Sequence, residues 1–478
     1  MSEDLCYMSA TELAKAYRSK ALSPREVVEA VVRRAEALQP RLNMLVTLCA
    51  EQALDAAARA EADFMGADSL PPLHGIPATV KDLEDTAGVR TTYGSKHFAD
   101  HVPARDAIIW ARMKAQGAIL IGKTTTPEFG LNTVGESLLT GVTNNPWDVT
   151  RTTGGSSSGA GSAVAAGVGP VGTGSDGGGS IRVPSSFCGL VGLKATPGRI
   201  PYNGPDDAFE GVVVTGPMTR TVADCALMLD AVAGPDPYDG VAWPEPGGGH
   251  LAGLSDLSMK GVRIAYCLDL KSGPVEQQVR QAVEAAAKRF ESELGARVTE
   301  VQIDLPDWLE YFHHWWGPYI MRFVEDELDP LGHPEYIPAH VREAVESCRE
   351  TIDLASYVRH QYKVRTQLRT AFADIFQAYD LLIWPTTPSV AFPHPSSAGW
   401  PTEIEGQPLR DPHLDNQRFT EAISHAGYPA ITVPAGFTRE GLPIGLQIAS
   451  RAGAENAILR AAAAFEAIAP WAHLRPAC

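Results

Sequence analysis

Two glycine–serine clusters, separated by a segment suited to burial, constrain this chain more than any other feature. The first cluster covers residues 154–159 (Gly-Gly-Ser-Ser-Ser-Gly) and the second covers 177–180 (Gly-Gly-Gly-Ser). The stretch between them is largely apolar and includes Val164, Ala165, Ala166, Val168 and Val171. Flexible glycine–serine linkers lack such apolar content. The whole segment is therefore predicted to lie inside a folded core.

A phosphate-binding loop is a second interpretation of this segment. Residues 172–177 (Gly-Thr-Gly-Ser-Asp-Gly) fit the pattern Gly-x-Gly-x-x-Gly, but no acidic ribose ligand stands out about 20 residues later. The order Gly-x-x-x-x-Gly-Lys-Ser/Thr is missing as well. The sequence therefore disfavours nucleotide binding.

Acyl-transfer catalysis is the third interpretation. Three consecutive glycines precede Ser180, and residues without a Cβ can adopt conformations that let backbone N–H groups converge on one point. An oxyanion hole requires such converging donors. Ser180 would lie beside the hole as a nucleophile, and a serine nucleophile needs a base. No histidine–aspartate pair with the Gly-x-Ser-x-Gly context is evident to supply one.

The rest of the chain alternates helical and strand-like segments. Residues 1–65 are predicted to be helical, and the short apolar runs of about 73–200 predict the buried strands of a catalytic core. Residues 262–303 predict a β-α-β unit. The aromatic segment of about 305–377 predicts a helical insertion. We therefore expect a single α/β domain over residues 1–478.

Composition and charge exclude several classes of partner. A net charge of −17 without a dense Lys/Arg cluster argues against nucleic acid binding. No run of about 18 apolar residues exists, so no membrane span is expected. Seven scattered cysteines without a Cys-x-x-Cys pair indicate neither a zinc site nor a disulfide framework. The acidic N-terminus lacks the layout of a signal peptide, so we expect a cytoplasmic location.

Several motifs in one order resemble the amidase signature family. The glycine–serine segment, from residue 154 to the Gly-Leu-Val-Gly-Leu-Lys run at 189–194, resembles the signature itself. Upstream, residues 74–82 (His-Gly-Ile-Pro-Ala-Thr-Val-Lys-Asp) resemble the strand that carries the family's catalytic lysine. Downstream, residues 426–434 and 441–447 resemble its C-terminal sheet region. The similarity covers nearly the whole chain.

The resemblance implies a fold and a catalytic triad. The fold would be a mixed, twisted β-sheet covered by helices on both faces. Lys81 matches the catalytic lysine, Ser156 the bridging serine in a cis peptide arrangement, and Ser180 the nucleophile. The backbone N–H groups of Gly177, Gly178, Gly179 and Ser180 would hold the oxyanion. The family mechanism needs no metal and no cofactor, and neither is expected here.

Further residues are implied as supports of the site. Ser157, Asp176 and Arg182 fall where the family uses hydrogen bonds to hold the glycine loop. Gly130 falls where the family's substrate channel passes the oxyanion hole, so a role in substrate binding is expected.

The chain also departs from the family pattern. Ser158 stands where a glycine is common, Ser175 stands where a threonine is common, and Gly177 replaces a frequent larger residue. None of these departures removes a catalytic group. Each could alter the loop shape and hence the choice of substrate.

The expected function is hydrolysis of the C–N amide bond of a small molecule through an acyl-enzyme on Ser180. A carbamate or ester hydrolase with the same mechanism stays open, as does a glutamine-dependent amidotransferase subunit. A non-catalytic binding protein that keeps the fold is disfavoured, because all three triad residues are present. The aromatic segment 311–323 suggests a bulky or apolar substrate group, although core packing explains it equally well. A homodimer is compatible with the sequence.

Overall fold

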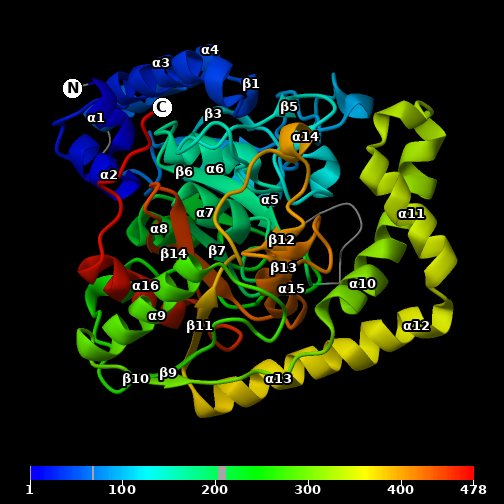
Figure 1. Ribbon diagram of the computed structural model, residues 1–478. Helices are drawn as coiled ribbons and strands as arrows, with labels where there is room; N and C mark the ends of the chain where they lie inside the picture. Colours follow the sequence, from blue (N-terminus) through cyan, green and yellow to red (C-terminus); the bar gives the residue numbers. More distant parts are fainter. Residues whose placement is uncertain (1, 67–68, 203–210) are drawn as a thin grey trace.

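An 11-stranded mixed sheet forms the centre of the molecule and is flanked by helices (Figure 1). The computed structural model describes residues 2–66, 69–202 and 211–478. The strand order is β1-β3-β2-β6-β8-β7-β14-β15-β11-β9-β10. Strands β3, β2 and β6 run parallel to one another, as do β11, β9 and β10, whereas the strands between these two groups pair antiparallel. The expected mixed α/β sheet is confirmed.

The strands of this sheet are short and mostly buried. Their bounds are β1 Leu45–Leu48, β2 Pro77–Lys81, β3 Ile119–Thr124, β6 Val171–Asp176, β7 Val191–Lys194, β8 Val214–Thr219, β9 Arg263–Tyr266, β10 Arg297–Glu300, β11 Leu381–Pro385, β14 Ala430–Phe437 and β15 Pro443–Ala449. Two small two-stranded sheets pair β4 Glu136–Ser137 with β5 Gly141–Val142, and β12 Glu403–Ile404 with β13 Gln407–Pro408.

Sixteen α-helices occur in the described ranges. They are α1 Ser2–Tyr7, α2 Ala10–Arg18, α3 Pro24–Leu42, α4 Ala50–Gly66, α5 Ile108–Ala115, α6 Ser158–Ala165, α7 Arg182–Cys188, α8 Val222–Val232, α9 Gln277–Ser292, α10 Trp308–Phe323, α11 Ala339–Thr351, α12 Leu354–Val358, α13 Arg365–Ala378, α14 Pro395–Ala398, α15 Arg418–His425 and α16 Glu455–Ile468.

The N-terminal region is helical with one exception. Helix α3 begins with a capping box at Ser23 and Glu26, and it ends at Asn43, whose φ of 48° is left-handed. Strand β1 then pairs antiparallel with the edge of β3 before α4 begins. The expectation of helices throughout residues 1–65 was therefore wrong at this strand. This strand is only four residues long, too short for a periodic pattern to reveal it.

The expected β-α-β unit and the helical insertion are both observed. Strand β9, helix α9 and strand β10 form the unit, and the two strands pair in parallel. Helices α10–α13 extend along one side of the molecule, and two π-helical turns, Val324–Leu328 and Arg359–Val364, continue this helical path (Figure 1). The insertion packs against the sheet region mainly through α10 and α13, each of which contacts α15.

The glycine–serine segment lies at the centre of the fold, as predicted. Helix α6 is entirely buried and follows the first cluster, while β6 and α7 flank the second cluster. Close packing explains the small residues of this region, since a Cβ on Gly159 would lie 2.3 Å from the backbone nitrogen of Thr125. Among the described residues, no helix is long and apolar enough to cross a membrane. All seven cysteines are free thiols.

Candidate active site

Lys81 lies at the carboxyl end of β2, with its side chain fully buried. Its backbone N–H donates to Thr173 Oγ1 on the neighbouring strand β6 at 2.8 Å. Its ammonium nitrogen Nζ donates to Ser156 Oγ at 2.7 Å and to Ser175 Oγ at 2.9 Å. The two hydroxyls and the amine therefore form one buried cluster.

Burial changes the protonation of Lys81. Desolvation disfavours the ammonium form and lowers the pKa of Lys81 to about 7, although Glu84 and Asp176 act in the opposite direction. An ordinary lysine, with a pKa near 10.4, is almost fully charged at neutral pH. At pH 7 Lys81 is thus neutral in about half of the molecules and can accept a proton.

Ser156 follows a cis peptide bond with Gly155 and is 98% buried. Gly130, which has a left-handed φ of 75°, lies close beside it. A Cβ on Gly130 would stand 3.0 Å from Ser156 Oγ and 3.0 Å from Leu83 Cδ1. Glycine at position 130 therefore keeps space open next to the Ser156 hydroxyl.

The three-glycine turn joins β6 to α7 and packs tightly on α15. A Cβ on Gly178 would lie 2.1 Å from Glu421 Oε2, and one on Gly179 would lie 2.1 Å from Thr420 Oγ1. Gly179 also has a φ of 143°, a backbone conformation that side chains disfavour. Across the described residues, no protein acceptor takes the backbone N–H groups of Gly177, Gly178 or Gly179.

Ser180 ends this turn and is partly exposed to a cavity of about 590 Å³. The cavity is lined by Ser156, Ser175 and Ser180 together with Gly130, Gly177 and Gly178. The backbone N–H of Ser157 donates to the carbonyl of Ser180 at 3.2 Å, which ties the first glycine–serine cluster to the second. Of the other residues predicted to surround the reaction, Gly130, Gly177 and Gly178 thus share this cavity with Ser156 and Ser180, whereas Gly179 and Lys81 do not line it.

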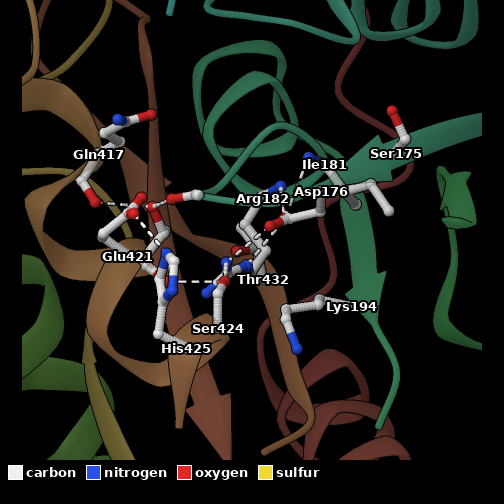
Figure 2. Close-up of polar contacts among 12 residues, drawn as sticks. Ser175, Asp176, Ile181, Arg182, Lys194, Gln417, Glu421, Ser424, His425 and Thr432 are labelled. Atoms are coloured by element: carbon white, nitrogen blue, oxygen red, sulfur yellow. Dashed lines mark hydrogen bonds and ion pairs between the residues drawn. The ribbon is translucent and has the colours of Figure 1, made fainter. Parts of the chain in front are cut away.

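Two of the predicted supporting residues, Asp176 and Arg182, lie side by side (Figure 2). Arg182 is fully buried and pairs with Asp176, donating from Nε to Oδ2 at 2.9 Å and from Nη2 to Oδ1 at 2.8 Å. Arg182 also donates to Gln447 and Ser424. Burial alone would raise the pKa of Asp176, but the charge and hydrogen bonds of Arg182 outweigh it and hold that pKa below its usual value.

The Asp176 carboxylate also holds the start of α7. Its Oδ2 accepts the backbone N–H groups of Ile181 at 3.1 Å and Arg182 at 3.4 Å. Ser157 contributes from the other side, since its hydroxyl lies between the backbone nitrogen and the carbonyl of Ser175. These contacts fix both ends of the glycine turn.

Sequence reasoning missed a buried carboxylate beside the turn. Glu421 Oε1 accepts from Trp316 Nε1 at 2.7 Å. The same oxygen lies 2.6 Å from His425 Nε2 (Figure 2). The other carboxylate oxygen, Oε2, faces Gly178 and has no hydrogen-bond partner among the described residues. Burial lowers the pKa of His425, although Glu421 opposes the shift. The sequence shows that Glu421 and His425 are four residues apart, as on one face of a helix. It does not show that Trp316 donates a hydrogen bond to Glu421.

Ser175 was also underrated by the sequence. It was predicted only as a departure from the family pattern, yet its hydroxyl is a direct hydrogen-bond partner of Lys81. Ser175 lies near the end of a buried strand, next to the strand that carries the predicted catalytic lysine. This position is the signal that could have identified it.

Aromatic and apolar side chains of the insertion form another part of the cavity lining. Helix α10 contributes Phe312, Trp316, Tyr319 and Ile320, and α11 contributes Val341. We call these five residues the aromatic wall. Phe129 and Leu131, from the loop after β3, also line the cavity.

Known proteins share both this sequence pattern and this fold. Residues 26–459 match the Amidase family. An acylamidase from Rhodococcus erythropolis is 38% identical over 99% of this chain and 98% of its own length. A glutamyl-tRNA(Gln) amidotransferase subunit from Moorella thermoacetica is 35% identical over 99% of both chains. The crystal structure of a bacterial aryl acylamidase has a TM-score of 0.89, with 28% identity over 97% of both chains.

The 11-stranded sheet with its flanking helices is thus the amidase signature fold. The chain belongs to the amidase signature family and is a hydrolase of that family.

Proposed function

We propose that this protein hydrolyses the amide bond of small N-acyl compounds through an acyl-enzyme on Ser180. The observation that carries the proposal is the 2.7 Å contact between Lys81 Nζ and Ser156 Oγ, made by a fully buried lysine whose pKa is lowered to about 7. A buried lysine in contact with a serine that shares a cavity with the nucleophile is suited to general-base catalysis.

The proposed first half-reaction transfers the acyl group. Ser180 Oγ attacks the carbonyl carbon, its proton passes to Ser156 Oγ, and the Ser156 proton passes to neutral Lys81. The new C–O bond makes a tetrahedral intermediate whose oxyanion accepts N–H bonds from the glycine turn. When the C–N bond breaks, the proton returns through Ser156 to the leaving nitrogen, which departs as a neutral amine.

The second half-reaction releases the acid. A water molecule gives a proton along the same path, and its oxygen attacks the ester carbonyl. Collapse of the second tetrahedral intermediate breaks the C–O bond to Ser180, which regains its proton. Lys81 and Ser156 end the cycle as they began it, so the chemistry balances without an external reagent.

The aromatic wall supports an aryl or bulky apolar substrate. Its side chains line the same cavity as the serines and most of them are only half-buried, so they offer apolar area to a ligand. Covering a ring with such side chains stabilises it by about 25 cal/mol per Å² of apolar area. The acylamidase and aryl acylamidase relatives agree with this choice.

A glutamine-releasing amidotransferase subunit fits the cavity less well. Such a site must hold the ammonium and carboxylate of the amino acid. Among the described residues, the charged ones that line the cavity are Glu343, Arg410 and Asp411, of which only Arg410 is a cation that could hold the carboxylate. Arg410 already pairs with Asp307 at 2.9 Å, and Asp411 Oδ1 accepts the backbone N–H groups of His413 and Leu414. Ester and carbamate hydrolysis use the same acyl chemistry and stay open.

A substrate panel tests the proposal. We expect wild-type protein to hydrolyse at least one aryl acylamide, in a panel that also contains primary amides, esters, carbamates and glutamine. Ser180→Ala should lose this activity by several orders of magnitude, about 10³-fold or more, and should no longer be labelled by a fluorophosphonate. Activity retained in Ser180→Ala would refute the assignment. Glutamine as the preferred substrate would favour the amidotransferase alternative.

A further inference from the structure

Two histidines and a glutamate meet on the insertion, on a different face of α10 from the aromatic wall. Glu310 and His314 are one helical turn apart on α10, and His360 lies in the π-helical turn Arg359–Val364. One ligand atom from each of the three side chains lies within 4.8 Å of the others. The two imidazole rings stack with their centroids 3.8 Å apart and an angle of 20° between their planes.

Both imidazoles are oriented by backbone carbonyls. His314 Nδ1 lies 2.8 Å from the carbonyl of Glu310, and His360 Nδ1 lies 2.8 Å from the carbonyl of Ser356. A carbonyl oxygen can only accept, so each Nδ1 carries a proton. In the neutral rings, the Nε2 atoms therefore keep their lone pairs. Metal-binding histidines are typically fixed in this way by a hydrogen bond from the other ring nitrogen.

A simple ion pair between His360 and Glu310 is the competing interpretation. Their closest approach, His360 Nε2 to Glu310 Oε1, is 3.5 Å, which is long for a charge-assisted hydrogen bond. By contrast, one ligand atom from each of the three side chains lies close enough to the others for a single ion to contact all three.

We propose that Glu310, His314 and His360 bind a divalent transition metal ion, with Zn²⁺ the best match to two imidazoles and one carboxylate. The ion would complete its coordination with solvent, because Glu310 is exposed. It would join α10 to the helical segment that continues into α13. Since α10 carries most of the aromatic wall, the ion would also fix that wall in place.

The spacing of the cysteines in the sequence predicted no metal site. This histidine–glutamate cluster was therefore missed from the sequence. His360 follows His314 by 46 residues (360 − 314 = 46), so no short motif marks the pair. The π-helical turn brings them together, and such turns occur frequently at functional sites.

Zinc titration of the metal-stripped full-length protein tests the proposal. We expect saturable binding of one Zn²⁺ per chain by calorimetry, accompanied by a rise in Tm. Glu310→Gln and His314→Gln alter exposed or half-exposed side chains, and each should weaken binding at least about tenfold. His360→Gln should do the same, but the two other variants are decisive if this buried substitution reduces folding.

His333→Gln is the matched control. His333 is an exposed histidine of the insertion that lies 3.1 Å from a single carboxylate, Glu335, and the variant should bind Zn²⁺ as the wild type does. Co²⁺ should give the visible absorption of a nitrogen–oxygen site in wild type and not in His314→Gln. Absence of equimolar binding in wild type, or undiminished binding in Glu310→Gln and His314→Gln, would overturn the proposal. Ser180→Ala should bind Zn²⁺ normally, which separates this test from that of the hydrolase activity.

Discussion

The two sides of the cavity are built in opposite ways. One side, which we call the serine–lysine wall, consists of Ser156, Ser175 and Ser180, which line the cavity, and of Lys81, which contacts two of these serines but does not itself line the cavity. Three of these four side chains are buried, and Lys81 is hydrogen-bonded to two of the serines. The aromatic wall consists mostly of half-exposed side chains on helices at the periphery of the fold.

We infer from this difference that one wall carries out the proposed proton transfer and the other wall selects the substrate. The proposed proton path needs a lysine that is neutral near pH 7. Burial at the centre of the sheet lowers the pKa of Lys81 and so provides such a base. A substrate-binding surface needs accessible apolar area, and the insertion provides it. We therefore expect changes in the serine–lysine wall to lower the rate constant or the folding stability. Changes in the aromatic wall should alter the apparent affinity for substrate.

Loss of the buried amine should have the largest effect. Lys81→Met removes the proposed base, and kcat/KM for an aryl amide should fall by about 10²–10⁴-fold. Ester hydrolysis should fall less, since an alcohol depends less on the returned proton than an amine does. Steady-state assays of a matched amide and ester measure both. Equal losses for the two substrates would contradict the proposed role.

Lys123 provides the matched control for burial. It lies on β3, opposite Val80 of β2, and burial lowers its pKa to about 8. It donates to Thr86 Oγ1 and Thr91 Oγ1 at 2.9 Å, whereas Lys81 donates to Ser156 and Ser175, which line the cavity. Lys123→Met should destabilise the fold, whereas kcat per folded molecule should stay close to the wild-type value.

The ion pair behind the glycine turn should have the next largest effect. Asp176→Asn leaves the Arg182 guanidinium buried without its counter-charge, so the free energy of unfolding should fall by about 3–5 kcal/mol. Urea denaturation measures this loss. Asp326→Asn removes an exposed partner of Arg322 in the insertion and should change stability by less than about 1 kcal/mol. Similar losses in the two variants would contradict the contrast between the two regions.

The pH profile should follow Lys81. Because protonated Lys81 cannot accept a proton, kcat/KM should rise with pH and be half-maximal near pH 7, the value to which its pKa is lowered. The change between pH 6 and pH 8 should therefore be about tenfold. A profile that is flat over this range would remove Lys81 as the titrating base. Variants of the aromatic wall should keep the same midpoint.

The sequence predicted the central region better than the periphery. Lys81, Ser156 and Ser180 could be predicted as site residues because each lies in a short motif that resembles the family pattern, and the structure brings Lys81 and Ser156 into contact. The Glu421–Trp316 hydrogen bond joins residues 105 positions apart, and the His314–His360 pair depends on how two helices cross. Such contacts arise from tertiary packing, which no local pattern encodes. The single-domain organisation over residues 1–478 stays a prediction.

The smallest expected effect tests the aromatic wall at the point where it touches the turn. Trp316 donates to Glu421 Oε1, and its ring edge would lie 2.8 Å from a Cβ on Gly177. Trp316→Leu removes ring area from the cavity, so KM for aryl amides should rise about three- to tenfold, equivalent to about 1 kcal/mol. Steady-state kinetics should show a kcat within about twofold of wild type, because the serine–lysine wall is unchanged.

The control for this substitution is Tyr362→Leu, an equally large change at an exposed aromatic side chain of the insertion, where KM should not change. A small aliphatic amide, which cannot reach across the cavity, should show the same KM in Trp316→Leu and in wild type. If kcat fell instead while KM stayed constant, the Glu421–Trp316 contact would be holding the glycine turn in its catalytic shape. The two walls would then act as one unit, and the separation of chemistry from selection would fail at this residue.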